Sequence, residues 1–378
     1  MKKLVIIAVL VLAGCGGSAI SYYKRGVFHE NKGEYAKALK SYRNSVKHDS
    51  TYVLSYMGIG SIMKKTERWE DALYHYRKAN NMGIDDHEIY MMLGEIYEVL
   101  GEMEKAKVAY GKAIKSRPDD ALTHLRLGGS LEKNLQFEEA LEEYNRAIAV
   151  AIDFPEAFFH SARMLVMLGR AEEAEKTYLQ ALKLKKNYVE AQNNLTAIYI
   201  DTGQEVKAFE SAAKTLQMDG GYIPGIVNMG IVYEKLGERE KAEEFYRHAI
   251  SRDKQYNMGY YRLALLLLRE NKTDEALQEF KRALRYDKNF PPVYNEIGLL
   301  ELEKGNYRDA LDYLKRAVAL DSTYAIAHYN MGGILENIGD YRGAAEAYDR
   351  YLAHATTPAD SLAVKTKIKI LLAVTRKK

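Results

Sequence analysis

The sequence is poor in proline and in surplus charge, and it has no long apolar run. Six prolines in 378 residues leave long stretches free to form helices. Lysine and arginine number 55 against 52 aspartates and glutamates, so the chain lacks the basic surplus typical of nucleic-acid-binding proteins. No apolar run reaches the ~18 residues that a membrane-spanning helix needs. We therefore expect neither a nucleic-acid partner nor a membrane-spanning helix.

The sequence also lacks the signatures of catalysis and of cofactor or metal binding. Its nine histidines are scattered, and no metal-ligand spacing occurs. HExxH, GxSxG, P-loop and dinucleotide-binding motifs are all missing. We expect no catalytic residue, no cofactor and no metal site, so the protein is predicted not to be an enzyme.

What the sequence does contain is a strict period of 34 residues. Alanine recurs at this step ten times, at Ala38, Ala72, Ala106, Ala140, Ala174, Ala208, Ala242, Ala276, Ala310 and Ala344. Twelve residues before each alanine stand Gly26, Gly60, Gly94, Gly128, Ala162, Thr196, Gly230, Ala264, Gly298 and Gly332. Four residues after each alanine stand Tyr42, Tyr76, Tyr110, Tyr144, Tyr178, Ala212, Tyr246, Phe280, Leu314 and Tyr348. Such a period indicates stacked units, each of two helices and a short turn.

The residue types at these positions have a physical reason. Where the two helices of a unit cross most closely, only a small side chain fits, and an added methylene costs roughly 1–3 kcal/mol. The aromatic ring fills space between the helices, while a tyrosine hydroxyl can reach a polar partner. Because one such hairpin cannot bury its apolar face alone, neighbouring units must stack.

This pattern resembles the tetratricopeptide repeat family over residues 19–358, as ten repeats without an insertion. The resemblance implies an all-α fold: a right-handed superhelix of about ten helix-turn-helix repeats, with the first helix of each repeat lining a concave groove. Positions below are counted from the first residue of each repeat, which is residue 19 in repeat 1. Residues 359–378, which follow Pro358, are expected to form a C-terminal capping helix.

Repeat 6 departs most from the pattern and leads into the segment GGYIPG (220–225). Glycine widens the backbone's freedom and proline lacks an N–H, so this segment is a candidate hinge. It would divide the array into repeats 1–6 (19–222) and repeats 7–10 (223–358). The alternative is an ordinary turn between repeats.

The first 18 residues predict export and lipid attachment. Lys2 and Lys3 precede an apolar stretch, Leu4 to Leu12, that is too short to span a bilayer and is typical of a signal peptide. The following LAGC (12–15) resembles the lipobox of bacterial lipoproteins, in which the cysteine receives the lipid. Residues 1–14 are then the signal peptide, Cys15, the sole cysteine, is the lipidation site, and residues 15–18 are a short tether. No aspartate follows Cys15, which favours the outer membrane, facing the periplasm.

A binding groove is predicted from the repeat register. In such repeats, positions 2, 5, 9 and 12 of the first helix usually face the concave side. Apolar residues occupy these positions in repeats 7–9, at Val227, Ile231, Tyr261, Leu265, Leu268, Leu299 and Leu302. The run LALLLL (263–268) leaves its helix no polar side, so burial on all sides is expected. Either a partner's amphipathic helix or extended segment lies there, or local repacking or self-association covers the surface.

Two polar patterns refine this prediction. Asn194, Asn228 and Asn330 at position 6 resemble part of the asparagine ladder that grips a peptide backbone in some repeat grooves. The carboxylate clamp that binds chaperone tails, with lysine at position 5 and asparagine at position 9, is missing from every repeat. A receptor for cytosolic chaperones is therefore disfavoured.

The resulting hypothesis is a non-catalytic scaffold, anchored by lipid in the bacterial envelope, that binds envelope proteins or peptides. Its layout is similar to lipidated repeat proteins that assist pilus secretins or outer-membrane protein assembly. Two alternatives stay open: an adaptor that recruits a cell-wall hydrolase or protease, and a component of polysaccharide export.

Overall fold

The computed structural model describes residues 16–83, 85–354 and 361–375, and all regular structure in these ranges is helical. The chain divides into two compact units, Met1–Ala191 and Gln192–Lys378. Cys15 and the rest of the predicted signal peptide lie outside the described residues.

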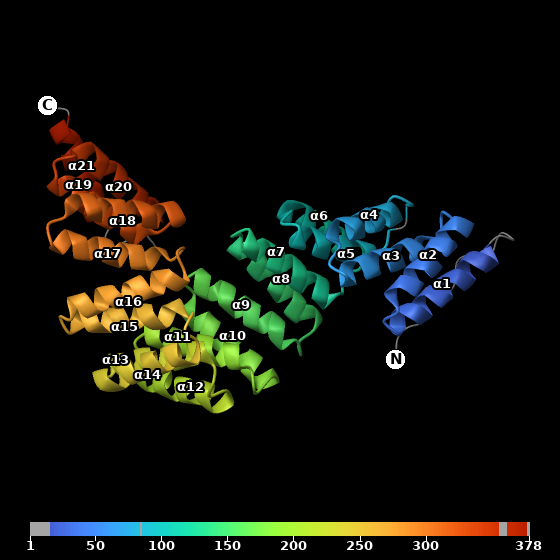
Figure 1. Ribbon diagram of the computed structural model, residues 1–378, viewed down its shortest axis with the longest axis horizontal. Coiled ribbons are helices and arrows are strands. Elements are labelled where there is room, and N and C mark those ends of the chain that lie inside the picture. The colour runs from blue at the N-terminus through green and yellow to red at the C-terminus, as the bar shows by residue number, and fades with distance from the viewer. Residues whose placement is uncertain (1–15, 84, 355–360, 376–378) are drawn as a thin grey trace. The chain divides into compact units, whose positions relative to one another are not determined.

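The helices follow one another as hairpins (Figure 1). The first unit contains α1 (Gly16–Asn31), α2 (Tyr35–His48), α3 (Val53–Lys65), α4 (Trp69–Asn80), α5 (His87–Val99), α6 (Met103–Ser116), α7 (Ala121–Lys133), α8 (Phe137–Val150), α9 (Pro155–Met167) and α10 (Ala171–Leu184). The second contains α12 (Glu205–Met218), α13 (Ile223–Lys235), α14 (Arg239–Arg252), α15 (Asn257–Arg269), α16 (Thr273–Tyr286), α17 (Pro291–Glu303), α18 (Tyr307–Leu320), α19 (Ala325–Asn337), α20 (Tyr341–His354) and α21 (Ser361–Thr375). Helix α11 (Val189–Asp201) includes the boundary between the units.

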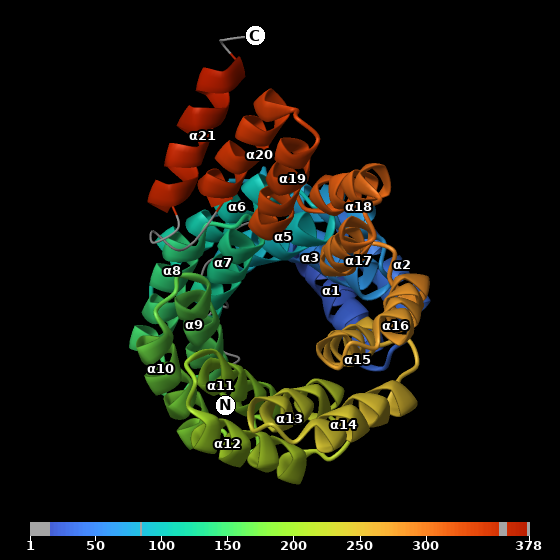
Figure 2. The same ribbon diagram turned by 90° about the vertical axis from the view of Figure 1, so that its left-hand side faces the viewer.

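The helix boundaries keep the sequence period. Each odd-numbered helix from α3 to α19 begins at position 1 of a repeat, and each even-numbered helix from α2 to α20 begins at position 17. Within each unit, odd-numbered helices lie along one face of the stack and even-numbered helices along the other (Figure 2). The predicted all-α fold of stacked two-helix repeats is confirmed. The predicted last helix corresponds to α21, which packs against α20.

The turn inside each hairpin takes a left-handed backbone conformation at position 15. Seven of the ten residues there are glycine: Gly33, Gly101, Gly169, Gly203, Gly237, Gly305 and Gly339. The other three, Glu67, Leu135 and Asn271, take the same conformation with φ of 57–60°. This conformation disfavours residues with a Cβ, which explains the preference for glycine.

The small residue at position 8 is set by the ring at position 24 of the same repeat. A Cβ placed on glycine 26, 60, 94, 128, 230 or 332 would lie only 2.4–2.7 Å from the tyrosine ring. Real side-chain atoms do not approach so closely, so each glycine leaves the space that its ring fills. The predicted close helix crossing is therefore present, and these rings are almost fully buried.

Repeat 6 fills this space differently. Thr196 and Ala212 exchange the usual sizes, with the larger residue at position 8 and the smaller at position 24. The Thr196 hydroxyl donates to the Gln192 carbonyl at 3.1 Å and bonds Ser211 Oγ at 2.9 Å. Gln192 Nε2 also donates to Ser211 Oγ, at 2.6 Å. A buried hydrogen-bond network thus replaces the ring, and its polar groups are satisfied.

The segment GGYIPG connects α12 to α13 by a turn that recurs elsewhere in the chain. Asp219 Oδ1 accepts the backbone N–H of Gly221 at 2.8 Å, as Asp253 accepts that of Gln255 at 2.8 Å. Neither Gly220 nor Gly221 takes a left-handed conformation. The proposed hinge stays a prediction that depends on composition, since the turn itself has the ordinary hydrogen bonding of these junctions.

Candidate binding face

The described residues carry no arrangement suited to a metal or to a bilayer span. In residues 16–83, 85–354 and 361–375, no three His, Cys, Asp or Glu side chains are placed to hold a metal ion. No helix in the same ranges has both the length and the apolar character to cross a bilayer. The candidate sites are therefore surfaces of the helix stack.

The seven predicted groove residues lie on three odd-numbered helices of the second unit, α13, α15 and α17. Five of them are half-buried and form what we call the apolar strip: Tyr261, Leu265, Leu268, Leu299 and Leu302. Tyr261, Leu265 and Leu268 pack against one buried apolar cluster of this unit, and Leu302 packs against the next. The strip keeps part of its surface on the face of the odd-numbered helices.

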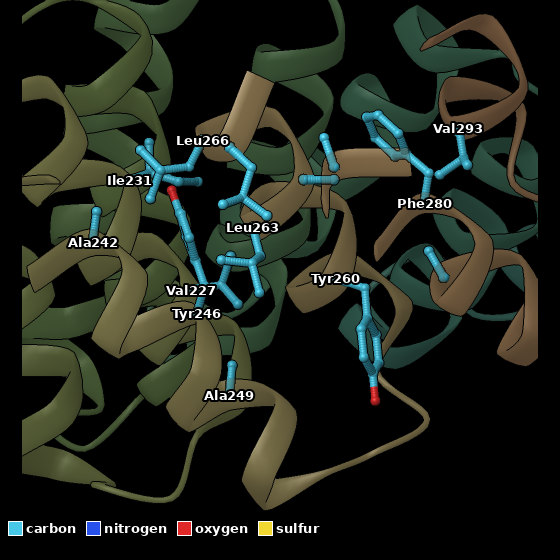
Figure 3. Packing of buried hydrophobic residues seen from close by; sticks show 14 of the residues in the cluster. Val227, Ile231, Ala242, Tyr246, Ala249, Tyr260, Leu263, Leu266, Phe280 and Val293 are labelled. Carbon is cyan, nitrogen blue, oxygen red and sulfur yellow. The ribbon is translucent and has the colours of Figure 1, made fainter. Parts of the chain in front are cut away.

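The other two residues require a correction. Val227 is only 3% exposed and Ile231 only 8% exposed, so neither offers a surface to a partner. Both belong to the cluster that contains Leu263 and Leu266 of α15 (Figure 3). The neighbouring repeat covers them, because apolar side chains of that size at positions 5 and 9 gain more from burial than from exposure. They belong to the buried cluster against which Tyr261, Leu265 and Leu268 of the strip pack.

The LALLLL run divides into core and strip. Leu263, Ala264, Leu266 and Leu267 are at most 2% exposed. Leu265 and Leu268 remain half-buried. Most of the apolar character of this helix therefore serves packing between repeats, and two of its six residues remain as candidate binding surface.

A polar contact that the sequence analysis missed joins position 12 to position 24. In five repeats the tyrosine hydroxyl donates to a glutamate of the same repeat at 2.6–3.2 Å, in the pairs Tyr42–Glu30, Tyr110–Glu98, Tyr144–Glu132, Tyr246–Glu234 and Tyr348–Glu336. Each glutamate also pairs with a cation of the following repeat or of α21: Lys65, Lys133, Arg163, Arg269 and Lys367. The sequence does contain a signal for this contact: a glutamate stands twelve residues before the tyrosine and recurs with the 34-residue period.

Two of these glutamates, Glu30 and Glu132, have a lowered pKa. Burial alone would raise the pKa of Glu30, but hydrogen bonds from Lys65, Tyr42 and Ser61 outweigh burial and leave the pKa lowered. Glu132 has a lowered pKa for similar reasons, through His160, Tyr144 and Arg163 after the opposing effect of burial. These carboxylates are therefore held in their charged form.

The same register gives part of the apolar strip a packing explanation. In repeats 8 and 9, position 24 is Phe280 or Leu314, which have no hydroxyl, and position 12 is Leu268 or Leu302. Where no hydroxyl is available, a glutamate at position 12 would lose its donor, and an apolar residue is preferred there. Leu265 and Leu299, at position 9, have no such counterpart and carry more of the case for binding.

The predicted peptide-gripping amides bond to other repeats. Asn228 Nδ2 donates to the side chain of Asn193 at 2.9 Å. Asn330 Nδ2 donates to the side chain of Asn295 at 2.8 Å. Asn194 also has a partner within the chain. Adjacent first helices lie close enough for Asn228 and Asn330 to bond a neighbouring asparagine, and the role of these amides in gripping a peptide stays a prediction.

The face of the odd-numbered helices in the first unit is charged. A pocket of about 320 Å³ is lined by Lys64, Trp69, Glu95, Glu98, Val99, Arg126 and Lys133. Its charges are paired within the protein: Lys64 Nζ lies 2.5 Å from Glu95, and Lys133 Nζ lies 3.1 Å from Glu98. A ligand would have to compete with these ion pairs, so the pocket is a weaker candidate than the strip.

A second pocket, of about 470 Å³, is explained by helix ends. Asp86 and Asp120 among its lining residues accept the backbone N–H groups of Ile89 and Thr123, at 3.1 and 2.9 Å. Aspartate commonly caps helix N-termini in this way. Two of the four acidic groups of this pocket therefore cap α5 and α7.

Comparison with known proteins agrees with the repeat register. Two sequence models described as tetratricopeptide repeat match the chain, one at residues 125–189 and 295–361, and the other at 19–52, 87–120, 224–256 and 259–290. Together they cover more than half of the chain, so the protein belongs to the tetratricopeptide repeat family. The unmatched stretches include most of repeat 6, whose packing differs. No curated protein matches the chain in sequence.

Solved structures with the same fold are distant in sequence. Yeast Tom70 is 13% identical with a TM-score of 0.61, over 95% of this chain and 96% of that one. A tetratricopeptide repeat protein from Parabacteroides merdae is 17% identical with a TM-score of 0.61, over 66% of this chain and 98% of that one. At such identities the likeness concerns the fold alone. Proteins of this family are generally scaffolds for protein–protein interaction, with a fold that is typically non-catalytic.

Proposed function

We propose that this protein is an interaction scaffold of the bacterial cell envelope, anchored by lipid at Cys15, that assists the assembly of an envelope complex. The observation that carries the scaffold role is the array of tetratricopeptide repeats. The envelope location is supported by Lys2 and Lys3, the short apolar stretch, and the LAGC motif before the glycines. The complex is of the pilus-secretin or outer-membrane assembly type.

The anchor has a direct test in Cys15→Ser. We expect the variant to leave the membrane fraction and to lose incorporation of a labelled fatty acid, because each buried methylene of an acyl chain contributes ~0.8 kcal/mol to membrane binding. Helical content, measured by circular dichroism, should not change, since the described helices begin after this residue. A variant that stays acylated and membrane-bound would exclude the lipid anchor at Cys15.

The proposed partner site is the apolar strip on α15 and α17. The strip leaves five apolar side chains partly accessible on one face, and it suits an amphipathic helix or an extended segment of another protein. Leu265 is the residue chosen for the test. It lies at position 9, so, unlike Leu268 and Leu302, its apolar character is not explained by a missing tyrosine hydroxyl at position 24.

Leu265→Lys is expected to release the envelope partner while the array stays folded. Lysine at a half-buried position can extend its ammonium group into solvent. Ala264→Leu is the matched control: Ala264 is fully buried, and overpacking there should cost roughly 1–3 kcal/mol of stability. Partner retention by the full chain would be measured beside thermal melting. A Leu265→Lys protein that melts like Ala264→Leu, or that keeps its partner, would place the site elsewhere.

A further inference from the structure

Glu296 is a carboxylate without a counter-ion on the face of the apolar strip. It lies at position 6 of repeat 9, on α17, one turn before Leu299, and is half-buried. Its Oε1 accepts a hydrogen bond from Asn295 Nδ2 at 3.0 Å. No ion pair reaches Glu296 from any residue in the described parts of the chain. The same register that drew attention to asparagines at position 6 contains this glutamate.

Glutamates at two other positions of this face are paired. Six occupy position 9 or 12, and each lies within ion-pair distance of a lysine or arginine: Glu30, Glu95, Glu98, Glu132, Glu234 and Glu336. Burial leaves Glu296 with a raised pKa, whereas the pKa values of Glu30 and Glu132 are lowered. An unpaired carboxylate in partly apolar surroundings is costly to the folded chain, and a cation brought to it recovers part of that cost.

The charge of Glu296 acts on two tyrosines, Tyr261 of repeat 8 and Tyr324 at the end of repeat 9. Burial raises the pKa of Tyr261 on α15 to about 12, and the charge of Glu296 adds to the rise. Burial also raises the pKa of Tyr324, just before α19, with Tyr261 and Glu296 as further causes. Both rings are half-buried, and Tyr261 meets Phe290 edge to face at 5.3 Å. Tyrosine rings of this kind can also attract a cation.

Arg262 is the candidate internal counter-ion, since it holds position 6 of the preceding repeat. It forms no ion pair within the described residues, and its Nε is buried without a hydrogen-bond partner. Its guanidinium lies 6.0 Å from the centre of the Tyr261 ring. The charge of Arg262 is not among the causes that set the pKa of Glu296, so it does not neutralise this carboxylate.

We propose that the apolar strip binds a segment of a partner protein that is apolar but carries one lysine or arginine, which pairs with Glu296. Leucine-like side chains of the segment contact Leu265 and Leu299, and its cation contacts the Glu296 carboxylate. This inference rests on the proposed function and specifies the chemistry of the partner. A purely apolar partner is disfavoured because it would desolvate Glu296 without supplying a counter-ion.

The test is selection from a displayed library of random 12-residue peptides on the immobilised full chain. We expect apolar peptides enriched in lysine or arginine from the native protein. Glu296→Gln, which keeps the side-chain shape, should lose that enrichment. Glu301→Gln is the matched control on the same helix, because Glu301 is paired with Lys304 at 3.1 Å. Replacing the selected cation by alanine in the best peptide should weaken binding about tenfold to the native protein. The same replacement should change binding to Glu296→Gln little.

Each contrary result has a distinct meaning. Peptides that lack a basic residue, yet lose binding with Leu265→Lys, would overturn the inference about Glu296 and leave the strip as a binding site. Selection that Leu265→Lys does not affect, or no selected peptide at all, would overturn the strip and the inference together. A basic preference that appears only with Arg262→Gln would show that Arg262 neutralises Glu296 in solution, which also contradicts the inference. Thermal melting of every variant confirms that the array is folded.

Discussion

Single residues in the hairpin turns store strain that the rest of the repeat tolerates. Leu135 adopts a φ of 60° and leaves 72% of its surface exposed. A left-handed conformation costs a residue with a Cβ roughly 1–2 kcal/mol, and an exposed side chain gains little packing in return. Asn271 adopts the same conformation more cheaply, because asparagine tolerates this region better than leucine.

We expect Leu135→Gly to raise the free energy of unfolding by about 0.5–1 kcal/mol, the relief of strain less the extra chain entropy of glycine. Gly169→Leu, at the same position of the next repeat, should lower it by about 1–2 kcal/mol. Urea unfolding of both variants measures the two effects. A Leu135→Gly protein less stable than the parent would mean that the leucine makes a contact worth more than the strain.

Glu296 should make stability depend on pH in a direction opposite to that of Glu30. Since the pKa of folded Glu296 is raised above the ordinary 4.5, its protonated form is favoured in the fold. The associated stability is present below pH 4.5 and is lost as the pH rises through the folded pKa. Asn295 of α17 donates a hydrogen bond to Glu296, and the charge of Glu296 raises the pKa values of Tyr261 and Tyr324 beyond the effect of their burial.

The corresponding variant is Glu296→Gln, measured by thermal melting from pH 4 to pH 8. We expect it to melt like the parent near pH 4 and above the parent at neutral pH. Equal melting temperatures across the whole range would mean that this carboxylate is solvated in solution and already compensated.

At the scale of elements, the amino-acid composition of a turn between two helices does not by itself predict how flexible the turn is. Residues 220–225, which span the turn from α12 to α13 and the start of α13, contain three glycines and a proline, yet the turn is the aspartate-capped one found between other repeats. Its hydrogen bonds resemble those at Asp321, where Oδ1 accepts the Thr323 N–H at 2.9 Å. Composition and geometry therefore lead to opposite expectations for this joint.

Hydrogen exchange across the junctions decides between them. If residues 220–225 are a hinge, amides in 218–226 should exchange faster than those in 116–122 and 320–326, because local opening there removes fewer packed contacts. Similar protection in the three segments would mean an ordinary turn and would remove the division of the array at residue 222.

At the scale of the whole molecule, periodic features could be predicted from the sequence and non-periodic ones could not. The repeat number, the starts of α3 to α19, the glycine turns and the close contact at position 8 all follow from residues that recur every 34 positions. The burial of Val227 and Ile231 and the bonding of Asn228 to Asn193 depend on how closely adjacent repeats approach. The distance between adjacent repeats cannot be predicted from the residue type at any single position. Glu296 was missed for a related reason. It differs from the paired glutamates of this face in having no cation beside it in the described structure, and the sequence does not show which side chains lie side by side.

The position-24 tyrosine takes part in two kinds of contact. Duplication or transfer of a repeat would affect these two contacts differently. The glycine and the ring that fills its space belong to one repeat, so a duplicated repeat brings its own core with it. The glutamate bonded to that ring depends on a cation from the following repeat, as Glu98 depends on Lys133 and Glu234 on Arg269. A copied or transplanted repeat would therefore keep this internal contact between its two helices wherever it is inserted in the array. It would match its new neighbour only if that neighbour supplies a lysine or arginine in register, so these ion pairs encode the order of the repeats.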